Sequence, residues 1–498
     1  PLPMLTQRAL DRRANQNIPL DIKDVPIHQD YLNQISNANG ITIKAKSKWL
    51  NAVHVRGTQS NIEALSLFSF VSYIDFANGN LNAKSSSSSS SNELNSINKK
   101  FVATIDYNYG NSANQIQMLN GHLLHEQNFT GQGKIIAVLD SGFTGVNTAM
   151  PFQNLINNNQ ILGGYNFPDA NSNYFTRHFH GTYVLSCMGS VVENQLIGSA
   201  PNAQYYLFIT EDVNEENPVE ESYWVEAAEL ADYYGADIIN TSLGYFGYDN
   251  PSYSYTYNDM NGTTSFISRG LNIAHSRGMI VVVSAGNSGT TANPNIGTPA
   301  DALKAFTIGA VDSNENYVSF SSIGPTFDGR VKPDVVAKGL AATLSDTNGS
   351  IITASGTSFS SPIIAGMVAS FWSAVPNLTN DQVIQFIKES SDNFTNPTAQ
   401  KGFGVPDFQL ALNNALNLEN VVANHPVLYP NPVENEFTLL TNFTNSKLYI
   451  FNAIGQLVDE KEILSKQGVY SLSNLNSGIY FFKIETSNKT FSGKIQKK

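Results

Sequence analysis

The sequence has very little cysteine and little positive charge. Cys187 is the single cysteine among 498 residues, which excludes internal disulfides and multi-cysteine metal sites. The cellular compartment therefore cannot be inferred from cysteine content. Lys and Arg number 29 against 41 Asp and Glu, giving a net charge of -12. This balance excludes the basic stripe that binding to nucleic-acid phosphates requires.

Long hydrophobic runs are also absent. No stretch of about 18 apolar residues occurs, so no transmembrane segment is predicted. The chain begins at Pro1, without a methionine or a signal-like segment, so we expect the numbering to begin inside a longer precursor, for example behind a signal peptide. What is present is 41% apolar residues, enough to bury cores, and a length that predicts about three domains.

A tract of seven serines, at residues 85–91, separates the first domain from the rest. With the polar residues up to 106 it predicts an unfolded linker that proteases can reach. Residues 1–84 predict a small α+β module. We expect its strands and helix in this order: two strands within 41–55, a helix at 61–68 and a strand at 70–76.

Residues 107–420 alternate apolar runs with helical patterns. The runs are typical of strands buried on both faces and lie at 134–140, 203–209, 236–243, 279–286 and 305–311. Helical patterns such as 220–234 and 266–277 lie between several of them. This order predicts an α/β domain with a mainly parallel sheet and crossover helices.

Residues 425–498 predict a small all-β domain. Its short alternating strands are expected at 437–443, 447–453 and 478–486, with turns at Gly455, Gly468 and Gly478. Such a pattern is typical of a β-sandwich.

Three residues with catalytic chemistry stand at the ends of predicted strands or at the starts of predicted helices. Asp140 closes a strand, and His180 and Ser358 each stand where a helix begins. Alone, each has an ordinary explanation, since Asp forms turns and Ser caps helices. Together they suit nucleophilic catalysis, because a serine attacks well only when a histidine takes its proton and a carboxylate orients that histidine.

The order of these residues along the chain separates competing triads. In α/β-hydrolases the serine comes first and the histidine last, yet only His425 follows Ser358, at the edge of the β domain. GTSFS, at residues 356–360, also lacks the last glycine of their G-x-S-x-G turn. The order that remains is Asp140, His180, Ser358, which is that of subtilisin.

The chain from about Tyr107 to Leu416 resembles a subtilisin-like serine peptidase domain. The resemblance rests on VLDSG around Asp140, HGTYV from His180 and GTSFSSP around Ser358. It implies a three-layer subtilisin-like fold and peptide-bond hydrolysis. Ser358 would be the nucleophile, His180 the general base and then acid, and Asp140 the carboxylate that orients the histidine.

The same resemblance implies an oxyanion site and a substrate strand. In VVVSAGNSG it implies that Asn287 donates its amide to the oxyanion, with the backbone N–H of Ser358 as the second donor. Ser242, Leu243 and Gly244 match the strand that pairs with an extended polypeptide. Tyr245 departs from the small residue common there, so the side-chain preference stays open.

No cofactor is expected to be required. Calcium sites are frequent in the family, but no dense Asp/Asn ligand loop stands out, so calcium stays an open alternative and no metal ligands are assigned.

Several neighbouring residues have ordinary explanations. His178 lacks the Gly-Thr that follows His180 and is predicted to be a surface residue. Cys187 lies on an apolar helix face and is predicted to be a buried structural thiol. The other hydroxyls near Ser358 are assigned to capping and packing (Ser355, Ser360, Ser361) or to the turn (Thr357).

The two flanking domains resemble parts of secreted zymogens. Residues 1–84, with WLNAVHV, are similar to the tail of a subtilase propeptide, which implies an inhibitor that assists folding and is cut off between Ser85 and about Tyr107. The alternative is an unrelated accessory domain. The end of the chain, with VLYPNPVENEFTL, IFNAIGQLV and LNSGIYFFKI, is similar to the C-terminal sorting domain of type IX secretion in Bacteroidetes. Its alternative is a carbohydrate-binding or adhesive sandwich.

Together these features predict a subtilisin-like serine endopeptidase made as a zymogen, exported across the outer membrane, and secreted or held at the cell surface. Its expected partners are a polypeptide substrate, its own propeptide and the type IX secretion machinery. An alternative of another class is a non-catalytic surface binding protein on a peptidase fold. The presence of Asp140, His180, Asn287 and Ser358 argues against it. The terminal domain argues against an intracellular processing enzyme.

Overall fold

The structure is a computed structural model of the 498-residue chain. It describes residues 4–82, 107–424, 426–429, 431–441, 443–486 and 489–498. The chain forms two compact units, Pro1–Ala411 and Leu412–Lys498. The predicted linker at 85–106 lies outside the described residues, as does the predicted cleavage region up to Tyr107. The predicted domain boundaries therefore stay predictions.

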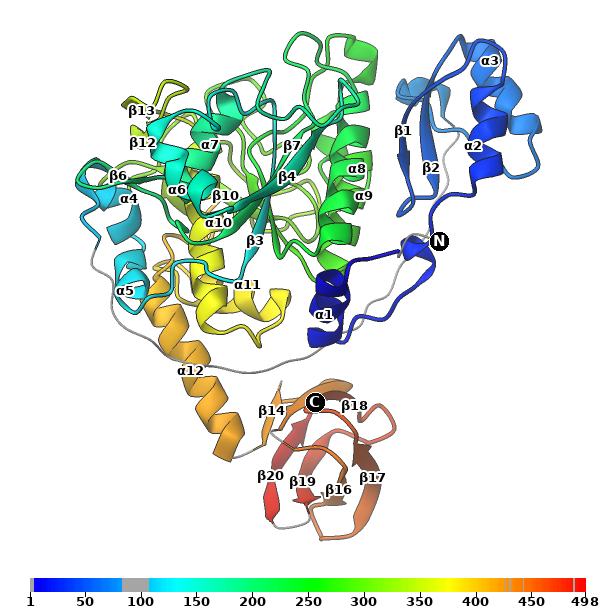
Figure 1. The fold of residues 1–498 in the computed structure, drawn as a ribbon. Coiled ribbons are helices and arrows are strands. Elements are labelled where there is room, and N and C mark those ends of the chain that lie inside the picture. Colours follow the sequence, from blue (N-terminus) through cyan, green and yellow to red (C-terminus); the bar gives the residue numbers. More distant parts are fainter. Residues whose placement is uncertain (1–3, 83–106, 425, 430, 442, 487–488) are drawn as a thin grey trace. The chain divides into compact units, whose positions relative to one another are not determined.

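The first unit is built around a seven-stranded sheet in the order β11-β10-β9-β8-β3-β7-β4 (Figure 1). All neighbouring strands in it are parallel. The strands are β3 (Ile135–Asp140), β4 (Ile161–Asn166), β7 (Gln204–Ile209), β8 (Ile238–Thr241), β9 (Ile280–Ser284), β10 (Phe306–Val311) and β11 (Val335–Lys338). Every residue of β3 and β10 is buried, as their continuous apolar runs predict. The predicted α/β class is confirmed.

Helices cover both faces of this sheet and give three layers (Figure 1). On one face, α8 (Val219–Tyr234) and α9 (Phe266–Ser276) share a buried core with Ala137 and Leu139 of β3. On the other, α7 (His180–Gly189) contacts β3, and α10 (Thr357–Ala374) contacts β3 and β8 to β11. The other helices are α4 (Ala113–Gln117), α5 (Gly121–Glu126), α6 (Gln153–Asn157), α11 (Asn380–Glu389) and α12 (Phe408–Asn424). Two antiparallel pairs complete the domain: β5 (Val191–Val192) with β6 (Leu196–Ile197), and β12 (Ala342–Ser345) with β13 (Ile351–Ala354).

The N-terminal module belongs to the same unit. Its elements are α1 (Gln7–Asn15), η1 (Ile22–Asp24), α2 (Gln29–Ser36), β1 (Thr42–Ser47), β2 (Ala52–Arg56), α3 (Gln59–Glu63), η2 (Ala64–Leu67) and η3 (Gly79–Leu81). The antiparallel pair β1–β2 confirms the two strands expected within 41–55. The helix expected at 61–68 is divided between α3 and η2. The strand expected at 70–76 is wrong: Phe70 and Ile74 pack from an irregular segment against the core of Ile35, Ile41 and Leu65, so their apolar spacing reflects burial without a strand.

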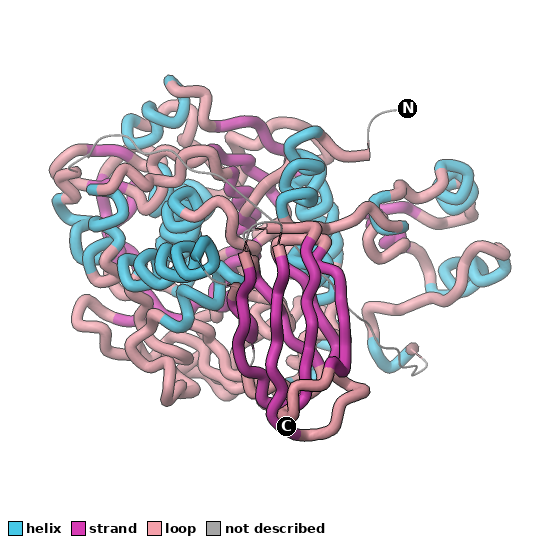
Figure 2. Tube along the Cα trace, turned by 90° about the horizontal axis from the view of Figure 1, so that it is seen from below, coloured by secondary structure: helices cyan, strands magenta, loops and turns pink. Residues whose placement is uncertain are grey.

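The second unit is a sandwich of two antiparallel sheets, whose strands run side by side in Figure 2. One sheet holds β14 (Val427–Tyr429), β15 (Glu436–Leu440) and β18 (Gln467–Ser471), and the other holds β17 (Leu457–Ile463), β16 (Ser446–Asn452), β19 (Gly478–Glu485) and β20 (Thr490–Lys497). Phe437 from one sheet and Ile450 from the other share one buried core, which confirms the predicted sandwich. Gly455 lies in a turn as expected. The turns expected at Gly468 and Gly478 are wrong, because Gly468 lies within β18 and Gly478 begins β19.

In the described part of the chain, no helix is both long and apolar enough to cross a membrane.

Candidate active site

The predicted site residues meet at the edge of the sheet where the parallel strands end. Asp140 is the last residue of β3, and Ser242 directly follows β8. Asn287 lies three positions beyond the end of β9. His180 and Ser358 stand in the first turns of α7 and α10, which pack against the same strands. Ligands of open parallel sheets bind at this edge.

The buried carboxylate of Asp140 forms a hydrogen bond with the partly exposed imidazole of His180. The imidazole Nδ1 lies 2.8 Å from Asp140 Oδ1, and Asp140 is 1% exposed. The backbone N–H of Ser141 donates to the same Oδ1 at 2.7 Å, which holds the carboxylate in place. Burial by itself would lower the pKa of His180, but the charge and hydrogen bond of Asp140 outweigh it and raise the pKa above 6.5. Asp140 therefore stabilises the imidazolium form of His180 more than burial destabilises it.

A glycine explains how α7 comes so close to β3. A Cβ on Gly181 would lie 2.5 Å from the carbonyl oxygen of Gly142 and 2.7 Å from the ring of Phe143. Thr182 fixes the same contact, because its hydroxyl donates to the carbonyl of Thr144 at 2.7 Å. In the sequence HGT, the glycine thus allows the close approach and the threonine holds it, and together they place His180 beside Asp140.

Ser358 bonds to Ser242, which directly follows β8. Its hydroxyl donates to the carbonyl of Ser242 in a long bond of 3.4 Å, and the hydroxyl of Ser242 donates back to the Ser358 carbonyl at 3.0 Å. The ring of the next residue, Phe359, lies 6.0 Å from the His180 ring between centroids. Among the described residues, no hydrogen bond joins Ser358 to His180. Hydrogen bonds between catalytic groups are often long without substrate and shorten when it binds.

Asn287 is held with its amide nitrogen free to donate. Its Oδ1 accepts from the backbone N–H of Thr357 at 2.9 Å and from the Thr357 hydroxyl at 3.0 Å. The backbone N–H of Gly286 in turn donates to that hydroxyl at 3.2 Å. Nδ2 lies 3.6 Å from the position that a Cβ would take on Gly356, at the start of α10. The N–H of Ser358 stands in the first turn of α10, where helix N–H groups have no partner within the helix.

The other hydroxyls near Ser358 pack as expected, but they do not cap the helix. Ser360 donates to the Thr357 carbonyl at 3.1 Å, Ser361 donates to Asn240 Oδ1 at 3.1 Å, and Ser355 accepts from the N–H of Ala341 at 3.0 Å. The capping role assigned to them is wrong. Thr357, which was assigned to the turn, is the first residue of α10, and Asn287 accepts its N–H.

Tyr245 anchors the segment that follows β8. It is 2% exposed, and its backbone N–H donates to the Thr298 carbonyl at 2.7 Å. Its hydroxyl lies 2.8 Å from both carboxylate oxygens of Glu211. Burial and the charge of Glu220 raise the pKa of Glu211 well above its usual range. No local motif predicted this contact; the one available signal is that Glu211 closely follows a predicted strand.

His178 lines a cavity close to His180 and keeps part of its surface exposed, which agrees with its prediction as a surface residue. Its ring is half-buried, with Nδ1 3.3 Å from the hydroxyl of Ser141. The cavity measures about 420 Å³ and is lined by Asp169, Arg177, His178, Val213 and Asn214. Burial and the charge of His180 lower the pKa of His178. Segments far apart in the sequence build this cavity, which is why no local motif predicted it.

Cys187 is fully buried, as predicted, and burial raises the pKa of its thiol to about 12. Among the described residues, no group of three or more His, Cys, Asp or Glu side chains is arranged to hold a metal ion.

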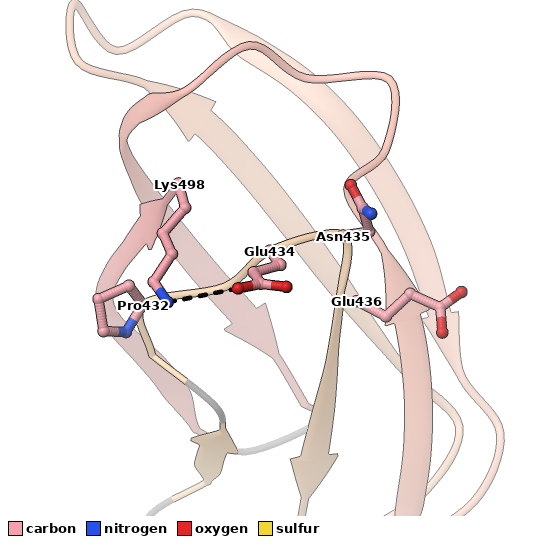
Figure 3. A pocket seen from close by; sticks show the side chains of 5 residues that line it. All are labelled: Pro432, Glu434, Asn435, Glu436 and Lys498. Carbon is pink, nitrogen blue, oxygen red and sulfur yellow. Dashed lines mark hydrogen bonds and ion pairs between the residues drawn. The ribbon is translucent and has the colours of Figure 1, made fainter. Parts of the chain in front are cut away.

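A second cavity lies in the sandwich and holds none of the predicted site residues (Figure 3). It measures about 700 Å³ and is lined by Pro432, Glu434, Asn435, Glu436 and Lys498. The amino group of Lys498 lies 3.4 Å from the Glu434 carboxylate.

Three family models match the chain in succession. The peptidase S8 propeptide domain of Bacteroidota matches residues 1–114, the subtilase family matches 131–405, and the secretion system C-terminal sorting domain matches 427–498. These matches replace the two alternatives for the flanking domains, an unrelated accessory domain and an adhesive sandwich. The sorting domain indicates type IX secretion to the cell surface or the extracellular space.

Curated relatives match the middle of the chain. Subtilisin DY of Bacillus licheniformis is 28% identical over 280 residues, which cover 56% of this chain and 90% of the relative. An alkaline protease of Alkalihalobacillus alcalophilus is 30% identical over 268 residues, which cover 54% of this chain and 61% of the relative. Among solved structures, MycP1 from Mycobacterium smegmatis is 21% identical with a TM-score of 0.48, covering 63% of this chain and 89% of that one. The chain belongs to the subtilase family of serine peptidases, and it carries a propeptide domain and a secretion sorting domain.

Proposed function

We propose that this chain is a secreted endopeptidase that cleaves polypeptides through an acyl-enzyme on Ser358. The observation that carries the proposal is the 2.8 Å bond between His180 Nδ1 and the buried carboxylate of Asp140, at the sheet edge where α10 presents Ser358. This bond places the Nδ1 proton toward Asp140 and leaves Nε2 as the basic nitrogen.

The reaction follows from the roles of these groups. Nε2 of His180 takes the proton of Ser358 as Oγ attacks the substrate carbonyl carbon and forms a tetrahedral intermediate. The oxyanion accepts hydrogen bonds from Asn287 Nδ2 and from the backbone N–H of Ser358. His180 then gives its proton to the leaving amine, and the C–N bond breaks to leave an ester on Ser358. A water molecule, deprotonated by His180, attacks this ester; the bond to Ser358 Oγ then breaks, His180 returns the proton to Oγ, and the carboxylic acid product is released.

The substrate is an extended polypeptide. Ser242, Leu243 and Gly244 lie between the end of β8 and Tyr245, and the contacts of Tyr245 with Thr298 and Glu211 fix one end of this segment. Leu243 is half-buried and Gly244 is exposed, so their backbone can approach a peptide. We infer that the substrate backbone pairs with this segment as an added strand.

Labelling with a fluorophosphonate tests the nucleophile. The processed protein is expected to carry the label on Ser358, and the Ser358→Ala variant to carry none. Ser355→Ala is the matched control, because it removes an exposed neighbouring hydroxyl and should leave labelling unchanged. The proposed steps use side chains and water only, so labelling and peptide hydrolysis should persist after EDTA treatment, with no cofactor required.

An unlabelled parent protein, or equal labelling of the parent and Ser358→Ala, would overturn the assignment. A non-catalytic binding protein on a peptidase fold would then be the better account.

A further inference from the structure

The region matched by the propeptide model has two separate parts in the structure. Residues 29–82 form a body with its own small core of Ile35, Ile41 and Leu65. Residues 4–24, here called the N-terminal clip, contain α1 and η1 and pack instead on the peptidase. Leu5 is 3% exposed and Ala9 is fully buried.

The clip caps the end of α8. The N–H of Thr6 donates to the Tyr233 carbonyl at 3.1 Å, Arg8 Nε donates to the Gly235 carbonyl at 3.1 Å, and Arg12 donates to the carbonyl of Ala236. Tyr233 lies in the last turn of α8, whose carbonyls have no partner within the helix, and the two arginines bring positive charge to this negative end of the helix. The clip therefore completes an element of the peptidase domain.

The clip also joins two further helices of the peptidase. Gln16 Nε2 donates to the carbonyl of Gly278, just beyond α9, at 2.8 Å. Gln16 Oε1 accepts from the N–H of Asn380, the first residue of α11, at 3.0 Å. One side chain of the clip thus connects the end of one helix to the start of another.

A buried carboxylate of the peptidase domain pairs with two arginines of the clip. Asp232 of α8 is fully buried, and its two carboxylate oxygens pair with Arg12 and Arg13, the latter at 2.7 Å. Arg13 also pairs with Asp24 of the clip at 2.9 Å. Both arginine side chains are at most 4% exposed. Because removing one partner of a buried ion pair is strongly destabilising, loss of the clip would be costly for Asp232.

α1 packs closely against the end of α8, where a glycine leaves room for it. Gly235, at the end of α8, has φ +82°, and a Cβ there would lie 2.8 Å from the N–H nitrogen of Ala9. A larger residue would force α1 away from α8, so backbone conformation and close packing both favour glycine at this position.

The body of the propeptide is held differently. Its main polar anchor is Glu229 of α8, which accepts from the Ser47 hydroxyl at 2.6 Å and from the N–H groups of Trp49 and Lys48 at 3.0 and 3.2 Å. No ion pair as buried as those of Asp232 joins the described residues of the body to the peptidase. Residues 25–28 connect the two parts, and Val25, Pro26 and His28 are exposed.

We propose that the N-terminal clip is a permanent, non-covalently bound part of the mature peptidase, and that it stays in place when a cut within the exposed segment 25–28 releases the rest of the propeptide. The surface around Asp232 is its docking site, and the partner it fits is a short helix bearing two adjacent arginines. The proposal uses the zymogen organisation of the family and does not depend on the roles proposed for Ser358, His180 and Asn287.

A cleavage experiment tests whether the clip stays. In the full-length Ser358→Ala chain, one recognition site for a specific protease is inserted after Pro26 and another replaces the serine tract. After both cuts and dilution to low nanomolar concentration, gel filtration with mass spectrometry should find the clip eluting with the peptidase. A clip found only in the small-peptide fractions would overturn the proposal. Because Ser358 is already substituted, this outcome is independent of catalytic activity.

A binding experiment tests the arginines without changing the peptidase. A labelled synthetic peptide of residues 4–25 should exchange into the cut complex. The peptide with Arg12→Ala and Arg13→Ala should bind at least about 100-fold more weakly. Lys23→Ala is the matched control: it removes one positive charge whose side chain takes no part in the contacts above, and should change affinity by less than about threefold. Equal affinity of all three peptides would contradict the proposed docking site.

Discussion

At the scale of single residues, two influences act in opposite directions on the pKa of His180, the proposed base. Burial disfavours the imidazolium, and the carboxylate 2.8 Å away stabilises it more strongly. In the proposed mechanism this balance favours His180 when it holds the serine proton, and it opposes the reaction in acid, when the neutral base is needed.

The pH dependence of hydrolysis should report this balance. Since the pKa of His180 is raised above 6.5 and the reaction needs the neutral base, kcat/KM should fall as pH decreases, with its acidic midpoint above 6.5.

Asp140→Asn removes the charge while burial remains, so kcat should fall by about 10⁴. Both predictions are measured as pH profiles on a peptide substrate at constant ionic strength, with Ser355→Ala as the reference variant. A parent midpoint at or below pH 6.5 would contradict the raised pKa of His180.

Substitutions of Asn287 can separate two functions: hydrogen-bond donation to the oxyanion and capping of the first turn of α10. Asn287→Ala should lower kcat by about 100- to 1000-fold with little change in KM, a magnitude known from subtilisin, because the oxyanion loses one donor. It also removes the acceptor for the Thr357 N–H. Asn287→Asp keeps that acceptor and lacks the donor, so it should lose at least as much activity. If Asn287→Asp keeps the parent kcat, the residue acts through the helix start instead of through the oxyanion.

At the scale of elements, the sequence predicted the centre of the sheet better than its edges. Continuous apolar runs located β3, β7, β8, β9 and β10, because strands buried on both faces need no polar alternation. The two edge strands were missed. β4 contains Gly163 and Gly164 and is mostly half-buried, and the apolar run of β11 is limited to the three residues 335–337, between Asp334 and Lys338.

In the site, too, features marked by a local sequence pattern were predicted, and contacts between distant segments were not. Local motifs predicted Asp140, His180, Asn287 and Ser358, since each has a characteristic glycine or hydroxyl beside it. The hydrogen bonds between Tyr245 and Glu211 join loops 34 positions apart, and no local motif records such a pairing.

The start of α7 offers a test of element placement. Gly181→Ala puts a Cβ 2.5 Å from the Gly142 carbonyl and should push α7 away from β3. A displacement of about 1 Å costs on the order of 100-fold in rate, so kcat should fall at least that much, while overpacking lowers the free energy of unfolding by about 1–3 kcal/mol. Steady-state kinetics and thermal unfolding measure the two effects. Gly247→Ala is the matched control, because its Cβ would meet only Ser254 Oγ at 3.9 Å. A fully active Gly181→Ala would mean that the contact does not position His180.

At the scale of the whole molecule, the two units bury separate cores. The sandwich encloses its own cluster, which includes Val433, Phe437 and Ile450. The peptidase core is built from β3, α8, α9 and their neighbours within the first unit. Separate cores imply that each unit can keep its fold when the other is removed.

Deletion of residues 426–498 should therefore separate export from catalysis. The truncated protein should fold, keep fluorophosphonate labelling at Ser358 and unfold at the parent temperature, because the peptidase core is untouched. It should no longer reach the cell surface or medium, since the matched sorting domain is gone. Fractionation of the producing cells, with labelling of each fraction, measures both properties, and a reporter protein fused to residues 426–498 is the matched control for export. A truncated protein that reaches the medium at the parent level would show that another part of the chain directs export, whereas an exported reporter would assign that role to the sandwich.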